Sequence, residues 1–251
     1  MKIAGTTFWI TGASGGIGAA LATELHRRGG RIAISARRRE RLEAVSQGRM
    51  HVEPLDITDK AAVHTAVQAV RDALGSIDVA VLNAGTWQQV RTDEFDAESF
   101  RTTFDTNVMG TVHCIEAVLP TMLVNRSGAI SGMASVAGYR GLPGSEAYGA
   151  SKAALINLLE SLRGSLGPRG IRVQTISPGF VKTDLTARNK FPMPFMISPD
   201  KAAAIIADGI AAEKTEIVFP LPMMLLMKTA RLVPNALWPK LFARTPMAGG
   251  K

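Results

Sequence analysis

Short strand-like segments recur along this chain, and segments with helical periodicity separate them. The strand-like segments are β-branched or alternate apolar with polar residues, and they lie at 7–11, 31–36, 52–55, 79–82, 129–131, 171–177 and 217–220. The helical segments lie at 21–28, 61–74 and 94–124. A further amphipathic helix is predicted between the fifth and sixth strand-like segments, with Leu155, Leu158, Leu159 and Leu162 on one face. This alternation predicts an α/β fold: a doubly wound parallel sheet with helices on both faces and ligands at the carboxyl edge.

A single domain over residues 1–251 is expected, because no linker, internal repeat or low-complexity segment divides the chain. Hydrophobic residues make up 46% and charged residues 20%, which is typical of a globular protein. The one cysteine, Cys114, excludes an intrachain disulfide and favours a reducing compartment. No signal-peptide core opens the sequence, so we expect a cytoplasmic protein.

Two further classes are not expected. The four histidines are scattered without metal-ligand spacing, so we predict no metal site. The sequence has no run of eighteen apolar residues, so we do not expect a membrane-spanning helix. The formal charge is +8, concentrated in Arg37-Arg38-Arg39-Glu40-Arg41 and in the tail at Lys228, Arg231, Lys240 and Arg244. No recognition-helix, zinc-finger or RNA-binding signature accompanies this charge, so nucleic acid is not an expected partner.

Tyr148 and Lys152 are the first candidates for chemistry. Residues four apart share one face of a helix, and a nearby ammonium favours the tyrosinate and lowers the pKa of the phenol. Ser135, thirteen residues before Tyr148, is placed to hold a carbonyl or alkoxide oxygen by a hydrogen bond. Ser131 is the competing serine, and the spacing favours Ser135. Alone, the Tyr-x-x-x-Lys pattern is also that of an ordinary helix surface pair.

A glycine-rich turn, Thr-Gly-Ala-Ser-Gly-Gly-Ile-Gly at residues 11–18, joins the first strand to the first helix. Glycines let the backbone approach a pyrophosphate, and the N–H groups of the helix N-terminus bind it. The spacing is longer than G-x-G-x-x-G, and a turn without a ligand is the alternative. The expected cofactor contacts in this turn are Gly12, Ser14, Gly15, Gly16, Ile17 and Gly18.

Several motifs follow this turn along the chain: Asn83-Ala84-Gly85, Asn107, Ser135, Tyr148 with Lys152, and Pro178-Gly179. In this order, the turn and these motifs resemble the short-chain dehydrogenase/reductase family over about residues 5–185. The resemblance implies a Rossmann-type sheet, Tyr148 as general acid/base, and Lys152 lowering the pKa of Tyr148 and holding the nicotinamide ribose. Ser135 would orient the substrate oxygen, and Asn107 would support a proton relay. The further implied cofactor contacts are Asp56, Ile57, Asn83, Ala84, Gly85, Pro178, Gly179, Val181 and Thr183. For Asp56, capping of the next helix is the alternative.

The end of the second strand favours NADP(H) over NAD(H). An acidic residue there would bind the ribose 2′-hydroxyl of NAD, whereas this chain has Ala36 followed by Arg37. A guanidinium binds a 2′-phosphate bidentately and a carboxylate repels it. Arg37 is therefore the expected phosphate ligand. A solvated helix start is the alternative for this basic cluster.

Two apolar segments lie outside the resemblance or at its edge. Residues 184–199 hold Phe191, Met193, Phe195 and Met196, and fall where the family has its substrate lid. Residues 221–251 form a divergent apolar and basic segment, in which Pro234 predicts a break between two short helices. We expect this tail to help form an apolar substrate pocket. A subunit interface, a core helix and peripheral membrane contact are the alternatives.

The hypothesis that follows is an NADP(H)-dependent oxidoreductase that interconverts an apolar ketone and a secondary alcohol. The alternative is a non-catalytic nucleotide sensor or scaffold on the same fold. A homodimer or homotetramer is expected, because the leucines around 155–162 offer more apolar surface than one sheet face needs and because the family pairs these helices.

Overall fold

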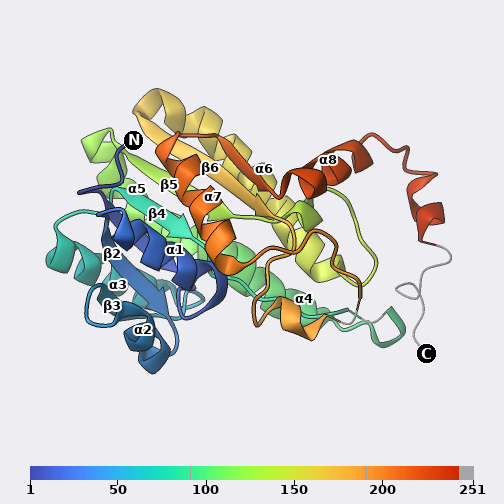
Figure 1. Cartoon of the computed structure of the whole chain (residues 1–251), viewed down its shortest axis with the longest axis horizontal. Coiled ribbons are helices and arrows are strands. Elements are labelled where there is room, and N and C mark those ends of the chain that lie inside the picture. The colour runs from blue at the N-terminus through green and yellow to red at the C-terminus, as the bar shows by residue number, and fades with distance from the viewer. Residues whose placement is uncertain (91, 190, 243–251) are drawn as a thin grey trace.

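A parallel sheet forms the centre of the computed structural model, which describes residues 1–90, 92–189 and 191–242 (Figure 1). Within these residues the strands follow the order β3-β2-β1-β4-β5-β6-β7, and all neighbours are parallel. The chain winds outward from β1 to β3, returns to β4 beside β1, and winds outward again. The strands are β1 Thr7–Thr11, β2 Arg31–Ala36, β3 His51–Pro54, β4 Val79–Leu82, β5 Gly128–Met133, β6 Ile171–Pro178 and β7 Glu216–Phe219.

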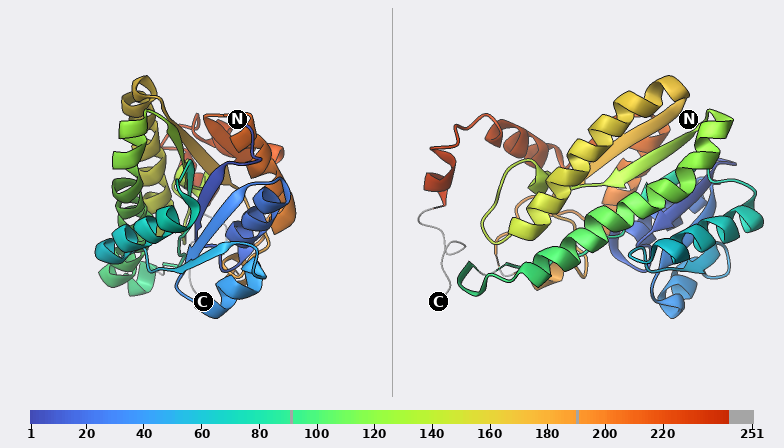
Figure 2. Two further views of the ribbon diagram at one scale, coloured as in Figure 1. Left: turned by 90° about the vertical axis from the view of Figure 1, so that its left-hand side faces the viewer. Right: turned by 180° about the vertical axis from the view of Figure 1, so that it is seen from behind.

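Helices cover both faces of this sheet (Figure 2). One face packs against α1 (Gly16–Arg27), α2 (Arg39–Ser46) and α7 (Pro199–Ala211). The other packs against α3 (Lys60–Leu74), α5 (Gly110–Asn125) and α6 (Glu146–Leu166), with α4 (Ala97–Phe104) against α6. The predicted doubly wound α/β fold is confirmed.

Strand β1 shows why the three residues at its centre are all apolar. Its side chains alternate between the faces, so Phe8 and Ile10 join the core beneath α1 and α7, whereas Trp9 joins the core beneath α3 and α5. All three side chains are fully buried. The Trp9 indole N–H donates to Ser35 Oγ at 2.9 Å, so its polar atom is satisfied inside the sheet.

The helices depart from the sequence prediction in three places. Helices α2 and α7 were not predicted, although Ser198 and Pro199 are typical of a helix start; the Ser198 hydroxyl caps α7 by accepting from the Lys201 N–H at 3.2 Å. The predicted helix at 94–124 is divided, because Asp96 caps α4 and a π-helical segment, Asp105–Met109, joins α4 to α5. That segment carries the fully buried Asn107.

The stretch Ala97–Asn125 has the length and hydropathy of a membrane span, with a mean hydropathy of 1.3 over its most apolar window. This window is 39% buried, and α5 directs Cys114, Val118 and Met122 into the core beneath the sheet. Burial raises the pKa of the Cys114 thiol to about 12, so this cysteine stays protonated and unreactive.

The described part of the tail, residues 221–242, contains one α-helix, α8 (Leu221–Ala230), and a short 3₁₀ turn at Trp238–Leu241 on the far side of Pro234. The break predicted at Pro234 therefore separates a helix from a single turn. Met223 and Met227 of α8 pack against Val136 and Tyr139. Figure 1 and the right view of Figure 2 show α8 and the turn extending beyond the sheet. Arg244 lies outside the described residues.

Candidate active site

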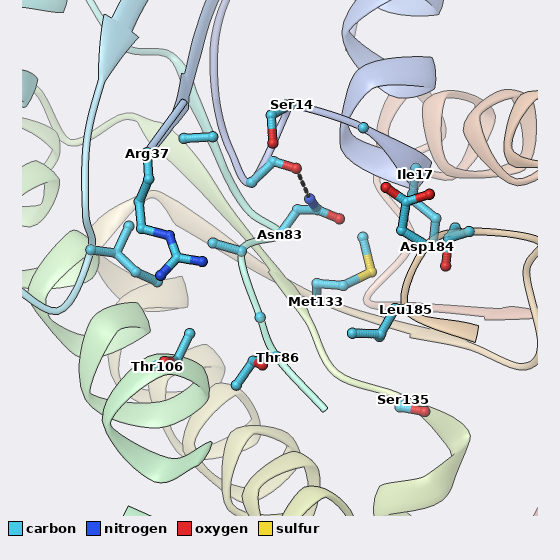
Figure 3. A pocket seen from close by; sticks show the side chains of 18 of the residues that line it. Ser14, Ile17, Arg37, Asn83, Thr86, Thr106, Met133, Ser135, Asp184 and Leu185 are labelled. Atoms are coloured by element: carbon cyan, nitrogen blue, oxygen red, sulfur yellow. Dashed lines mark hydrogen bonds between the residues drawn. The ribbon is translucent and has the colours of Figure 1, made fainter. Parts of the chain in front are cut away.

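A cavity of about 770 Å³ opens at the carboxyl ends of the strands, as expected for a doubly wound sheet. The loops that follow β1, β2, β3, β4, β5 and β6 all contribute to it. Among the residues expected from the sequence, those that line it are Gly12, Ser14, Gly15, Gly16, Ile17, Arg37, Asp56, Ile57, Asn83, Ala84, Gly85, Ser135, Tyr148, Lys152, Pro178, Gly179, Val181 and Thr183. Figure 3 places Arg37 and Ser135 at opposite ends of the cavity.

The glycine turn is held against the loop after β4 by close backbone packing. Gly12 has φ +68°, and a Cβ there would lie 2.6 Å from Ala84 Cα. Asn83 Nδ2 donates to the carbonyls of Thr11 and Gly12 at 3.0 and 3.1 Å, which locks the two loops together. Gly18 does not line the cavity, because it packs on Asn83 Nδ2 and the Gly12 carbonyl. Its role is to let the helix approach the strand.

The start of α1 fits a bound pyrophosphate. A Cβ at Gly15 would meet nothing within 4 Å, so the backbone there faces open space in the cavity. The first turn of α1 has no acidic residue, so no carboxylate competes for its exposed N–H groups. The residues present therefore fit a dinucleotide whose phosphates lie on this helix end.

The opposite end of the cavity from Ser135 is basic. Arg37, Arg38 and Arg41 all line it, and Figure 3 shows Arg37 reaching in from the end of β2. Within the described ranges no carboxylate pairs with Arg37 or Arg38, whereas Arg41 contacts Asp184 at 3.3 Å. Arg38 and Arg41 were not among the expected cofactor contacts, although their place in the basic cluster was a usable signal.

Asp56 also lines this end, but its carboxylate is engaged locally. Its Oδ1 accepts from both the N–H and the hydroxyl of Thr58, at 3.0 and 2.8 Å. Asp59, rather than Asp56, caps α3 by accepting from the Ala62 N–H. The capping alternative for Asp56 is therefore wrong, since the residue forms a turn that precedes the helix.

Ser135, Tyr148 and Lys152 come together at the other end. Ser135 follows β5 in a short turn and its Oγ accepts from the Ala137 N–H at 3.1 Å, while Tyr148 and Lys152 lie one turn apart on α6. Lys152 Nζ lies 5.6 Å from the centre of the Tyr148 ring and donates to the Met133 carbonyl at 2.7 Å. The competing Ser131 is buried within the sheet, where it donates to Gln174.

Burial dominates the titration of this group. It raises the pKa of Tyr148, and a hydrogen bond with the Ser135 hydroxyl partly offsets this by lowering it. It lowers the pKa of Lys152 to about 8, because an ammonium that is 3% exposed is poorly solvated. The pKa of Tyr148 is therefore raised, not lowered as its spacing to Lys152 predicted, and Tyr148 is a neutral phenol near pH 7 and able to donate a proton.

Asn107 lies behind the cavity wall rather than on it. Its Oδ1 accepts from the Thr86 N–H at 2.7 Å, and its Nδ2 donates to the Thr86 carbonyl and to Ser151 Oγ at 3.0 and 2.9 Å. Both amide hydrogens are therefore used. The side chain fixes the loop after β4 to α6, one residue from Lys152, and this arrangement suits a positioning role better than proton transfer.

The remaining lining residues were not anticipated. Several are polar residues near the start of the 94–124 segment or just after β4, and three belong to the segment expected to form the lid. They include Thr58, Thr86, Gln88, Thr102, Asp105, Thr106, Met133, Ala134, Asp184, Leu185 and Thr186. No motif marks these residues, because their approach depends on how the loops and α4 pack. The described part of the tail contributes none of the lining, contrary to expectation.

The fold and this site define a nucleotide-binding oxidoreductase. The family model described as short chain dehydrogenase matches residues 6–192, and the chain belongs to this family. It is therefore an enzyme that acts on CH–OH groups with NAD(P).

Individual relatives agree with this assignment. An uncharacterized oxidoreductase of Myxococcus xanthus is 39% identical over 92% of this chain and 94% of its own length. A second, from Staphylococcus aureus, is 34% identical over 71% of this chain and 79% of its own. A short-chain dehydrogenase structure from Streptomyces avermitilis covers 96% of this chain and 98% of its own, with 28% identity and a TM-score of 0.80.

Proposed function

We propose that this enzyme uses NADP(H) to interconvert a ketone and a secondary alcohol on an apolar substrate. The observation that carries the proposal is the arrangement of one cavity. Ser135, Tyr148 and Lys152 line one end of it, and Arg37 and Arg38 line the other. The first group suits proton transfer at a carbonyl oxygen, and the second suits a 2′-phosphate.

Tyr148 is the proposed general acid for ketone reduction and, in reverse, the general base. A bound nicotinamide supplies or accepts the hydride at the carbinol carbon. As charge develops on the substrate oxygen, the Tyr148 hydroxyl donates its proton there, and Ser135 Oγ holds the same oxygen by a hydrogen bond. The raised pKa of Tyr148 keeps this proton in place near neutral pH.

Lys152 supports Tyr148 through charge. Its Nζ is anchored on the Met133 carbonyl, which fixes its position beside the tyrosine ring. With a pKa of about 8 it is mostly protonated at pH 7, and an ammonium nearby stabilises the tyrosinate that remains after proton donation. Lys152 is also the residue proposed to hold the nicotinamide ribose.

An apolar substrate is supported by the side chains around the reacting end. Met133, Val181 and Leu185 line the cavity there, and Phe180 packs edge-on against Phe191 of the 184–199 segment with ring centres 6.0 Å apart. Flexible methionine and aliphatic side chains adapt to bulky apolar groups. We propose 184–199 as the lid of this pocket.

The test is Tyr148→Phe. The variant retains the ring packing and removes only the hydroxyl, so we expect ketone reduction with NADPH to fall by at least about a hundredfold, the size of a general-acid contribution. NADPH affinity, measured by fluorescence titration, should change little. Tyr139→Phe is the matched control, because the Tyr139 hydroxyl donates to Glu216 at 2.6 Å, away from the cavity lining. Activity of Tyr148→Phe above a few per cent of wild type would contradict the assignment.

A further inference from the structure

The tail presents an exposed apolar surface. Of the large hydrophobic side chains that the structure shows as exposed, half lie within residues 221–242. Leu232 is 82% exposed, and the others are at least half exposed. A single exposed leucine is ordinary, but six within 22 residues form a patch. The tail patch consists of Leu221, Leu225, Leu226, Leu232, Leu237 and Leu241.

This surface is held in place from behind. Met223, Met227 and Ala230 form the buried face of α8, and the two methionines pack on Val136 and Tyr139. Further along, the Trp238 indole N–H donates to the Gly141 carbonyl at 2.7 Å. Arg140 reaches in the opposite direction and donates to the Val233 carbonyl at 3.0 Å. The leucines therefore face outward while the opposite side of the segment is docked.

The charge of the segment has one sign. Residues 217–242 contain Lys228, Arg231 and Lys240 and no aspartate or glutamate. Lys228 pairs with Glu216 at 2.6 Å and Arg231 stacks over Tyr139, while Lys240 is exposed. An apolar face with basic residues beside it is the composition of a segment that lies in a membrane interface.

We propose that residues 221–242 dock on the surface of an anionic lipid bilayer. The ten residues of α8 make a helix of about 15 Å, which lies along an interface and cannot cross it. A second copy of the chain is the less suitable occupant. Across a two-fold axis each basic segment would face its own copy, and the segment supplies no carboxylate to compensate.

Docking would bring the reacting end of the cavity close to the lipid. Met223 of α8 lies directly behind Gly179, where a Cβ would come within 2.8 Å of Met223 Cγ, and Gly179 lines the cavity. The patch and the cavity wall thus share one packed layer. Delivery of an apolar substrate from the bilayer rests on the proposed function, whereas the docking itself does not.

The experiment is flotation of the full chain with lipid vesicles. We expect wild type to float with phosphatidylcholine vesicles that contain phosphatidylglycerol, to float much less with phosphatidylcholine alone, and to be released as ionic strength rises. Leu225→Ser with Leu226→Ser should weaken binding about tenfold or more, because two exposed leucines no longer enter the interface. Lys240→Glu should also weaken it.

Matched controls come from the opposite end of the strands. Val124→Ser removes an 83% exposed apolar side chain, and Arg169→Glu reverses an exposed charge, both outside the tail patch. Both should bind vesicles as wild type does. NADPH binding by every variant confirms folding and does not depend on catalysis. Failure of wild type to float, or equal flotation of the double leucine variant, would overturn the proposal. A smaller light-scattering mass for the double leucine variant, without flotation of wild type, would instead assign the patch to a second copy.

Discussion

At the scale of single residues, the site gathers groups whose ordinary chemistry is changed by burial. Lys152 is the clearest case, because its ammonium is almost inaccessible and its partner in hydrogen bonding is a neutral carbonyl, that of Met133. Water solvates the same ammonium fully in the unfolded chain. The folded protein therefore carries a cost at neutral pH that the unfolded chain does not.

That cost predicts a pH dependence of stability. The pKa of Lys152 is about 8 in the fold against an ordinary 10.5, so between these values the unfolded chain binds more protons and stability rises with pH. The full difference corresponds to about 3 kcal/mol. We expect Lys152→Met to gain stability relative to wild type at pH 7 and to lose that advantage by about pH 10. Urea unfolding at both pH values measures this, with the exposed Lys201→Met as the control; an advantage independent of pH would contradict it.

Arg37 leads to a prediction about cofactor choice. The described residues place no carboxylate against it, so its guanidinium is available to a 2′-phosphate. Changing Ala36 to Asp and Arg37 to Gln should raise the Kd for NADPH at least about tenfold and improve NADH binding, because a carboxylate repels the phosphate and binds the ribose hydroxyls. Fluorescence titration of both cofactors tests this.

Arg39→Gln is the control for this prediction. The Arg39 side chain pairs with Glu43 and lies off the cavity, so the substitution should leave the cofactor preference unchanged. Wild type that binds NADH as tightly as NADPH would refute the idea.

At the scale of elements, the arrangement of Ser135, Tyr148 and Lys152 depends on contact between a turn and a helix. The turn Val136–Gly138 follows Ser135, and a Cβ on Gly138 would lie 2.7 Å from backbone atoms of Lys152 and Ala153 in α6. These backbone atoms are held within α6, so they cannot move aside for a Cβ as the end of a flexible side chain could. Glycine is required here by close approach, and the approach sets the position of Ser135 relative to Tyr148.

Gly138→Ala should therefore cost about 1–3 kcal/mol of stability, the range for overpacking, and should lower kcat. Gly164→Ala is the matched change, and it lies on α6, the helix that Gly138 contacts. A Cβ there meets nothing within 4 Å, so alanine should stabilise by about 0.5–1 kcal/mol through helix propensity. Denaturant unfolding and steady-state kinetics measure both. Equal changes in the free energy of unfolding for the two substitutions would show that the close approach of Gly138 to α6 does not limit stability.

At the scale of the whole molecule, the leucines of α6 do not require a second subunit to cover them. Leu155 and Leu159 are buried beneath the sheet, and Leu158 and Leu162 pack partly on the same core, so one subunit accounts for them. The prediction of a homodimer or homotetramer now rests on the family resemblance. In the π-helical segment that carries Asn107, the Met109 side chain is 44% exposed.

Light scattering should give at least twice the chain mass of 26.7 kDa for wild type. If the α5 and α6 faces pair, Met109→Glu should reduce the mass toward that of one chain, since a buried unpaired carboxylate is costly at an interface. Leu232→Glu in the tail patch should not. A monomer at micromolar concentration in wild type would exclude the oligomer.

The sequence alone determined the strands and most of the helices, and nearly all of the site residues that it predicted line one cavity. Parallel pairing follows from the alternation, because parallel strands need helical crossovers, and the pairing of Tyr148 with Lys152 follows from the helical repeat. Local spacing is sufficient for such features, since it acts within a few residues. Helix α7 was not predicted, although Ser198 and Pro199 at its start are a local signal.

Tertiary structure decided what local spacing does not encode. It placed Asn107 behind the wall of the cavity, where its amide group forms hydrogen bonds with Thr86 and Ser151. It also brought Arg41 of α2 into contact with Asp184, which is 143 positions away in the sequence. It also placed the tail on the outside of the Val136–Tyr139 wall with its leucines in solvent, instead of in the pocket. Each outcome depends on which face of an element packs inward, and that is fixed by burial of the whole core and the satisfaction of distant hydrogen bonds.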